Sequence, residues 1–93
     1  MKHTIVMTGA SRGIGNVAAV RMLRDDADLH LVVTTRGNGD ELVAQLARDS
    51  GNRNVSWAGA ELSSLSSVRE AAVEIIGRLE SGDLPPLTGF VGN

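Results

Sequence analysis

A glycine-rich stretch near the N-terminus limits the folds open to this chain more than any other feature. It reads Thr-Gly-Ala-Ser-Arg-Gly-Ile-Gly over residues 8–15, follows the apolar run 4–7 and precedes a helical pattern of apolar residues. A strand, a glycine-rich turn and a helix N-terminus in this order form a phosphate-binding corner, because glycines let an anion approach the backbone and unpaired N–H groups of the first helical turn face it. The sequence therefore predicts an α/β unit with an anion site at this turn.

The glycine spacing is G-x-x-x-G-x-G. It differs from the G-x-G-x-x-G dinucleotide fingerprint, and no Gly-Lys-Ser/Thr follows it as in a P-loop. The stretch resembles, residue for residue, the cofactor motif of the short-chain dehydrogenase/reductase family. The resemblance implies that six of its residues contact a nicotinamide dinucleotide: Gly9, Ser11, Arg12, Gly13, Ile14 and Gly15. The alternative is a glycine-rich turn of an α/β domain that binds no nucleotide.

Strand-like and helix-like patterns alternate along the whole chain. Strands are expected at 2–8, 29–35, 55–60 and 87–91, and helices at 13–24, 40–49 and from the serine-rich segment 63–67 to about 79. Asp40 is the expected N-cap of the second helix. For the third, Ser67 and Glu70 have the spacing of a capping box, and Ser63 or Ser64 is an alternative cap one turn earlier.

This order, βαβαβαβ, predicts parallel strands joined by right-handed crossovers. The expected fold is α/β: a Rossmann-like, doubly wound parallel sheet in the order 3-2-1-4, truncated after the fourth strand. The nucleotide is then expected across the carboxyl ends of the strands, near the glycine turn and Asn93.

The end of the second expected strand decides how the adenosine ribose is bound. A carboxylate there would accept hydrogen bonds from a free 2′-hydroxyl and favour NAD, but the sequence has Thr-Thr-Arg at 34–36. The guanidinium of Arg36 suits a 2′-phosphate, and Arg12 is placed to reach the same group. In the family this basic pair accompanies NADP(H), which the sequence therefore favours over NAD(H). The alternative is that both are ordinary solvated arginines.

Two further segments match the family in part. Glu61 and Leu62 stand where the family has an Asp and an apolar residue that contact adenine; Glu61 alternatively only favours the start of the next helix. Asn93 matches the second residue of the family's Asn-Asn-Ala-Gly element, which borders the cofactor. The segments 62–69 and 84–87 resemble the retinol-dehydrogenase and protochlorophyllide-reductase-like branches.

The family's catalytic Ser, Tyr and Lys lie beyond the element where this sequence ends. The sequence has no tyrosine, and Lys2, its one lysine, precedes the first expected strand. We therefore assign no catalytic residue. Residues 1–93 are expected to form the N-terminal NADP(H)-binding portion of a single Rossmann-fold domain whose catalytic C-terminal half is absent.

Composition excludes several other classes. A net charge of −2 argues against a nucleic-acid or anionic-membrane surface, and the absence of cysteine excludes thiolate metal sites. No segment has the length of a transmembrane helix or the character of a signal peptide, so a cytoplasmic protein without a metal is expected.

The expected function is the nucleotide-binding part of an NADP(H)-dependent short-chain oxidoreductase, whose full-length form acts on a small-molecule carbonyl/alcohol pair. One alternative is a non-catalytic nucleotide-binding or interaction module derived from this fold. It would leave residues 87–91 as an apolar edge strand without charge or proline. Another is a different Rossmann-like binder, such as a methyltransferase, in which Arg12 and Arg36 would have no phosphate to bind.

Overall fold

The computed structural model describes residues 2–11, 13–61 and 64–92. Its elements alternate as the sequence predicts: β1 (His3–Met7), α1 (Gly13–Asp25), β2 (Leu29–Thr35), α2 (Asp40–Ser50), β3 (Val55–Gly59), α3 (Leu65–Ser81) and β4 (Leu87–Val91). The predicted bounds agree with these to within two residues, and the differences lie at element ends, where helices and strands fray.

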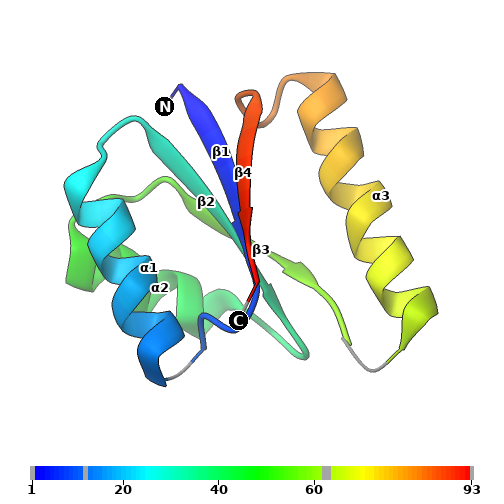
Figure 1. Cartoon of the computed structure of the whole chain (residues 1–93), viewed down its shortest axis with the longest axis horizontal. Helices are drawn as coiled ribbons and strands as arrows, with labels where there is room; N and C mark the ends of the chain where they lie inside the picture. The colour runs from blue at the N-terminus through cyan, green and yellow to red at the C-terminus, as the bar shows by residue number, and fades with distance from the viewer. Residues whose placement is uncertain (1, 12, 62–63, 93) are drawn as a thin grey trace.

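The four strands form one parallel sheet in the order β3-β2-β1-β4, which confirms the predicted Rossmann-like arrangement. Helices α1 and α2 cover one face and α3 lies on the other (Figure 1). β1 is central, so the turn that follows it opens at the middle of the carboxyl edge. β2 runs beside β1, with Met7 opposite Val33, and beside β3, with Thr35 opposite Gly59. This register brings the residues after β2 and β3 together.

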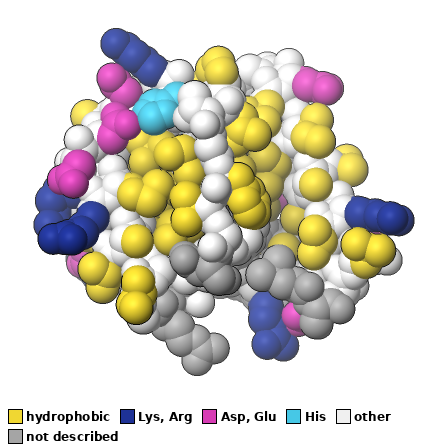
Figure 2. All heavy atoms as spheres, in the orientation of Figure 1, with side chains coloured by type: hydrophobic (Ala, Val, Ile, Leu, Met, Phe, Trp, Pro, Cys, Tyr) yellow, Lys and Arg dark blue, Asp and Glu magenta, His cyan; other side chains and the backbone are white. Residues whose placement is uncertain are grey.

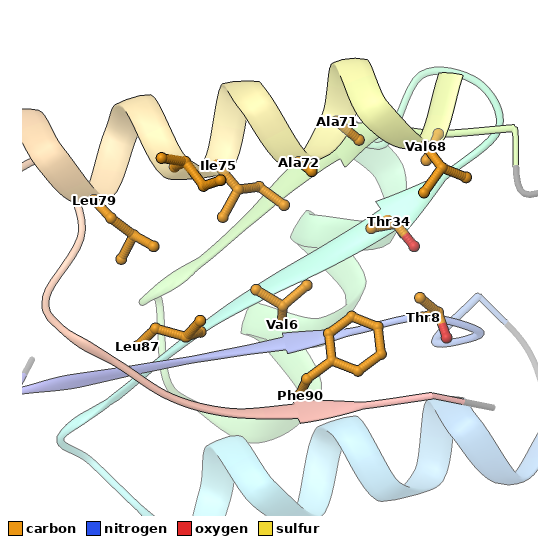
Figure 3. A pocket seen from close by; sticks show the side chains of 12 residues that line it. Val6, Thr8, Thr34, Val68, Ala71, Ala72, Ile75, Leu79, Leu87 and Phe90 are labelled. Atoms are coloured by element: carbon orange, nitrogen blue, oxygen red, sulfur yellow. The ribbon is translucent and has the colours of Figure 1, made fainter. Parts of the chain in front are cut away.

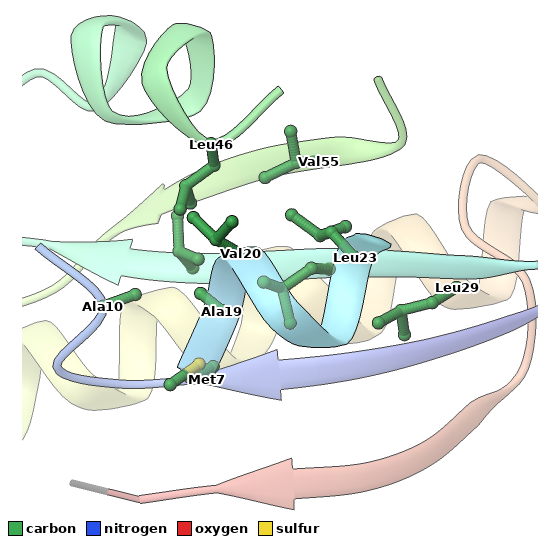
Figure 4. Packing of buried hydrophobic residues seen from close by; sticks show 10 residues of the cluster. Met7, Ala10, Ala19, Val20, Leu23, Leu29, Leu46 and Val55 are labelled. Atoms are coloured by element: carbon green, nitrogen blue, oxygen red, sulfur yellow. The ribbon is translucent and has the colours of Figure 1, made fainter. Parts of the chain in front are cut away.

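The main core lies between the sheet and the α1–α2 pair (Figure 4). Leu23 of α1 and Leu46 of α2 are fully buried against β2, whose odd-numbered residues Leu29, Leu31 and Val33 point to this face. Side chains alternate between the two faces of a strand, and both faces of β2 are covered. This accounts for the nearly continuous apolar run of β2.

The opposite face is less completely covered. Ile75 of α3 packs with Val6, Val32 and Ala58, together with the buried Leu84 after the helix. Between α3 and the β1–β4 side of the sheet lies an apolar groove of about 240 Å³ (Figure 3). Hydrophobic side chains gather on this side of the molecule around β4 and α3 (Figure 2). We call this the α3–β4 groove, defined by Val6, Thr8, Thr34, Ala60, Val68, Ala71, Ala72, Ile75, Ile76, Leu79, Leu87 and Phe90.

The start of α2 corrects one prediction. Asp40 is the first residue of the helix, not its N-cap; Gly39 takes the cap position without a side-chain hydrogen bond. The Asp40 carboxylate accepts a hydrogen bond from the Trp57 indole at 2.9 Å, and Asn38 Oδ1 accepts from the Asp40 N–H at 2.8 Å. The carboxylate is therefore directed toward β3, and the asparagine satisfies the first backbone donor.

Helix α3 begins one turn before the predicted Ser67–Glu70 box. Its N-cap is Ser64, whose hydroxyl accepts from the N–H of Ser67. The Ser67 hydroxyl in turn accepts from the N–H of Glu61 at 2.8 Å. These contacts connect the end of β3 to the first turn of α3 and fix the backbone of Glu61.

Candidate functional site

The glycine turn has the backbone geometry that its sequence predicts. Gly9 and Gly13 have φ angles of +71° and +65°, in the left-handed region that side chains with a Cβ disfavour. A Cβ on Gly13 would meet nothing within 4 Å, so open space lies beside the backbone where α1 begins. The turn thus presents exposed backbone at a helix N-terminus, the arrangement that binds anions.

Exposure differs among the residues of this turn. Ser11 and Ile14 are exposed, and Ile14 is 88% exposed. Gly15 is buried within α1. Arg12 lies outside the described residues, so its predicted contact is untested.

A pocket of about 330 Å³ lies beside the turn, at the carboxyl edge of the sheet. It combines residues from three separate connections, after β1, β2 and β3, that the parallel topology brings to one edge. It adjoins the α3–β4 groove, because Thr34 and Ala60 line both cavities. Its lining is Gly9, Ser11, Thr34, Thr35, Arg36, Ala60 and Glu61. Four of the predicted cofactor-binding residues are therefore together: Gly9, Ser11, Arg36 and Glu61.

Arg36 and Glu61 form an ion pair at this pocket, with Arg36 Nε 2.7 Å from Glu61 Oε2. The Arg36 side chain is 80% exposed and the Glu61 side chain 38% exposed. The hydrogen bond from the N–H of Ala60 to the carbonyl of Thr35 continues the β2–β3 pairing and holds the two connections together. The sequence indicates separate roles for Arg36, at the 2′-phosphate, and Glu61, at the adenine or the helix start. It does not predict their contact.

The structure adds Asn16 to the site, which the sequence did not single out. Asn16 Nδ2 donates to the carbonyl of Ala10 at 2.9 Å and so fastens the glycine turn to α1. Asn16 also exchanges side-chain hydrogen bonds with Gln45 of α2. The sequence offered one signal for this role: a polar residue three positions after the helix start and directly after the glycine motif.

Leu62 and Asn93, the remaining predicted contacts, also lie outside the described residues. The strand before Asn93 is placed where the prediction requires, because Val91 pairs with Met7 and its carbonyl accepts from the N–H of Thr8 at 2.9 Å. Among the residues that the structure describes, no group of three His, Cys, Asp or Glu side chains is arranged to hold a metal ion.

Comparison with known proteins identifies the family. The family model of short chain dehydrogenases matches residues 3–88, which includes every strand and helix described above except the end of β4. The chain belongs to the short-chain dehydrogenase family. The Bos taurus protein named dehydrogenase/reductase SDR family member 13 is 36% identical over 74 residues, which cover 80% of this chain and 20% of the bovine protein.

Solved structures of short-chain dehydrogenases share the fold and the arrangement of the sheet. A short-chain dehydrogenase of Sphingobium yanoikuyae, in complex with NADPH, is 37% identical with a TM-score of 0.61, over 82% of this chain and 29% of that one. An alcohol dehydrogenase of the archaeon Thermococcus sibiricus, complexed with 5-hydroxy-NADP, is 27% identical with a TM-score of 0.69, over 85% of this chain and 33% of that one.

This short-chain dehydrogenase chain thus spans about a fifth of the bovine relative and about a third of the archaeal structure. In the described ranges, no helix combines the length and the hydropathy that crossing a bilayer requires.

Proposed function

We propose that residues 1–93 are the N-terminal NADP(H)-binding portion of a short-chain oxidoreductase, with the 2′-phosphate of the cofactor bound by Arg36. The observation that carries the proposal is the position of Arg36 in the pocket beside the glycine turn. A guanidinium at the end of β2 offers several N–H donors and a permanent charge to a phosphate. The complexes of the two structural relatives with NADPH and 5-hydroxy-NADP support this choice.

The proposed roles extend from the pocket, lined by Gly9, Ser11, Arg36 and Glu61 among others, to the start of α1. The backbone at Gly9, Ser11 and Gly13 faces the pyrophosphate, Ile14 covers the cofactor on its exposed side, and Gly15 lets α1 approach. Arg12 assists Arg36 at the 2′-phosphate. Leu62 and Asn93 border the adenine and the far side of the cofactor, and Glu61 stands beside Arg36 at the 2′-phosphate end. The cradle fits a dinucleotide because a Cβ is absent where the backbone must come close.

When bound, the nicotinamide ring supplies the hydride, and the protein contributes binding, orientation and electrostatics. We assign no described residue to proton transfer. In the proposed full-length enzyme, the catalytic Ser, Tyr and Lys and the pocket for a carbonyl or alcohol substrate come from the C-terminal half. The 93-residue chain alone is then a cofactor-binding unit without hydride-transfer activity.

Calorimetric titration of the 93-residue chain with NADPH and with NADH tests the proposal. We expect NADPH to bind at least about tenfold more tightly, the effect of one charge-assisted phosphate contact. Arg36→Ala is expected to remove this preference. Arg48→Ala, which removes an exposed arginine of α2 outside the pocket, is the matched control and keeps it. Equal affinities for both cofactors in the unmodified chain contradict the proposal.

A non-catalytic interaction module is the second candidate, and the α3–β4 groove favours it. Leu87 and Phe90 of β4 are 50% and 66% exposed on an edge strand, and Ile76 of α3 is 52% exposed. Exposed apolar surface of this kind marks contact sites. A folded chain that binds neither nucleotide would support this second candidate and reject the first.

A further inference from the structure

The Arg36–Glu61 ion pair occupies the same guanidinium that the proposed function assigns to the 2′-phosphate. Arg36 Nε lies 2.7 Å from Glu61 Oε2, a charge-assisted contact. A 2′-phosphate therefore cannot take this Nε–H donor without displacing the Glu61 carboxylate.

Glu61 is held in place for this contact by its backbone. Its N–H donates to Ser67 Oγ at 2.8 Å, and its carbonyl accepts from the N–H of Ser64 at 2.9 Å. The Arg36 side chain is the more exposed partner, at 80% against 38% for Glu61. On binding a ligand, we expect Arg36 to move and Glu61 to stay.

The 2′-phosphate and the Glu61 carboxylate differ in charge, and this difference determines which of them binds Arg36. A phosphate monoester carries nearly two negative charges near pH 7 and three strong acceptor oxygens, whereas a carboxylate carries one charge. Exposed ion pairs are weak, so a phosphate can replace the carboxylate. A 2′-hydroxyl carries no charge and has no means of displacing it.

We propose that Glu61 is a specificity-determining residue that reduces the preference of this site for 2′-phosphorylated adenosine, by competing for the Arg36 guanidinium. This inference rests on the proposed function. Ligands with a 2′-phosphate must displace the carboxylate from the guanidinium or share the guanidinium with it, and in either case they bind beside its negative charge, whereas ligands with a free 2′-hydroxyl leave the pair intact. Arg36 thus raises the preference for ligands with a 2′-phosphate, and Glu61 lowers it.

The test uses two ligands that differ only in the 2′-phosphate, adenosine 2′,5′-bisphosphate and 5′-AMP, titrated calorimetrically into the 93-residue chain. Glu61→Gln preserves the size of the side chain and the backbone contacts but removes the charge. We expect it to tighten binding of the bisphosphate about three- to tenfold, the strength of a surface ion pair with added charge repulsion, and to change 5′-AMP binding less than about twofold.

Two controls separate this competition from other effects. Glu80→Gln makes the same change in net charge in the last turn of α3 and is expected to leave both affinities unchanged. In an Arg36→Ala background, Glu61→Gln is expected to lose most of its effect, because the competition acts through the guanidinium. A role of Glu61 at the adenine ring would instead change both affinities equally, and this result would overturn the inference.

An NMR measurement on the unmodified chain gives a second readout. The chemical shift of Arg36 Hε is expected to change when the bisphosphate is added and to remain the same when 5′-AMP is added. A chemical shift that neither ligand changes contradicts the exchange of anions at Arg36. If Glu61→Gln leaves the affinity ratio unchanged while Arg36→Ala lowers it, the inference fails and the proposed function stands. If Arg36→Ala leaves the ratio unchanged, the proposed function fails, and the inference with it.

Discussion

Asn16 of α1 and Gln45 of α2 exchange two side-chain hydrogen bonds, with N···O distances of 2.7 and 3.2 Å. Asn16 at the same time donates to the carbonyl of Ala10 in the glycine turn. One amide therefore connects the turn that faces the proposed cofactor to the helix pair behind it. The turn is thus fastened where α1 begins.

Removal of this amide is expected to loosen the turn. Asn16→Ala should lower the free energy of unfolding by about 1–2 kcal/mol, because it leaves the Ala10 carbonyl and the Gln45 amide without their partner. It should also weaken NADPH binding. Gln45→Ala breaks the link between the helices and a hydrogen bond to Asp49 within α2 but leaves the Ala10 contact, and it serves as the control, with binding retained. Urea denaturation and calorimetry measure both effects; a variant Asn16→Ala with unchanged NADPH affinity would contradict this role.

The contact between Gly39 and Trp57 gives a prediction about stability alone. A Cβ on residue 39 would overlap Trp57 Cγ, well inside contact distance. Trp57 is also held by its hydrogen bond to Asp40, so the ring has little freedom to yield. Gly39→Ala is expected to destabilise the chain by about 1–3 kcal/mol, the usual cost of overpacking. Gly37→Ala, where a Cβ meets nothing within 4 Å, is the matched control. Equal thermal melting points for the two variants would refute the steric argument.

The contacts of Asn16 and of Trp57 also show which parts of the structure the sequence alone does not predict. The strand order and the glycine turn were predictable, because they follow from local patterns and from the handedness of β-α-β crossovers. Asp40 has the residue type and position of an N-cap, yet its carboxylate binds Trp57, seventeen residues later. The Arg36–Glu61 and Asn16–Gln45 contacts depend on how separate elements are aligned, which no local pattern specifies.

His30 provides a pH-dependent prediction. Its ring is 9% exposed; burial, and secondly the charge of Arg78, lower its pKa below the ordinary value of 6.5. Arg78 Nη2 donates to Ser56 Oγ at 2.7 Å, and Ser56 Oγ lies 2.9 Å from His30 Nε2. The serine hydroxyl has one donor and two acceptor sites, so it can accept from the arginine and either donate to the ring nitrogen or accept from it. The lowered pKa favours the neutral form of His30 in the folded chain.

The sign of the pH effect follows from this lowered pKa. The unfolded chain takes up a proton on His30 as the pH falls through 6.5, before the folded chain does, so stability is complete above that pH and decreases below it. The decrease is at most about 1.4 kcal/mol per pH unit. Urea denaturation between pH 7.5 and 5.5 measures it in a His3→Gln background, where His30 is the one histidine. Adding His30→Gln should remove this dependence of the free energy of unfolding on pH. If the dependence is unchanged, another group causes it.

Asp26 acts in a lower pH range. Its hydrogen bond with His3, at 2.7 Å, lowers the pKa of the carboxyl group. The opposite nitrogen of His3 lies 2.8 Å from Thr88 Oγ1, so the pair also secures the start of β4. The stabilisation is complete above the unfolded pKa near 4 and is lost as the pH falls through the lower folded value. Asp26→Asn should lose this acid dependence and should increase amide hydrogen exchange in β4. Unchanged exchange in that strand would contradict the link.

We propose that the carboxyl edge of this short-chain dehydrogenase sheet binds a dinucleotide beside the glycine turn. An NMR titration of the ¹⁵N-labelled chain with NADPH tests this binding, because each backbone amide reports its own environment. We expect shift changes to concentrate at Gly9, Ser11, Gly13, Arg36 and Glu61, and NADH at the same concentration to produce smaller changes at Arg36. Changes confined to the α3–β4 groove, or no changes in a folded chain, would contradict it.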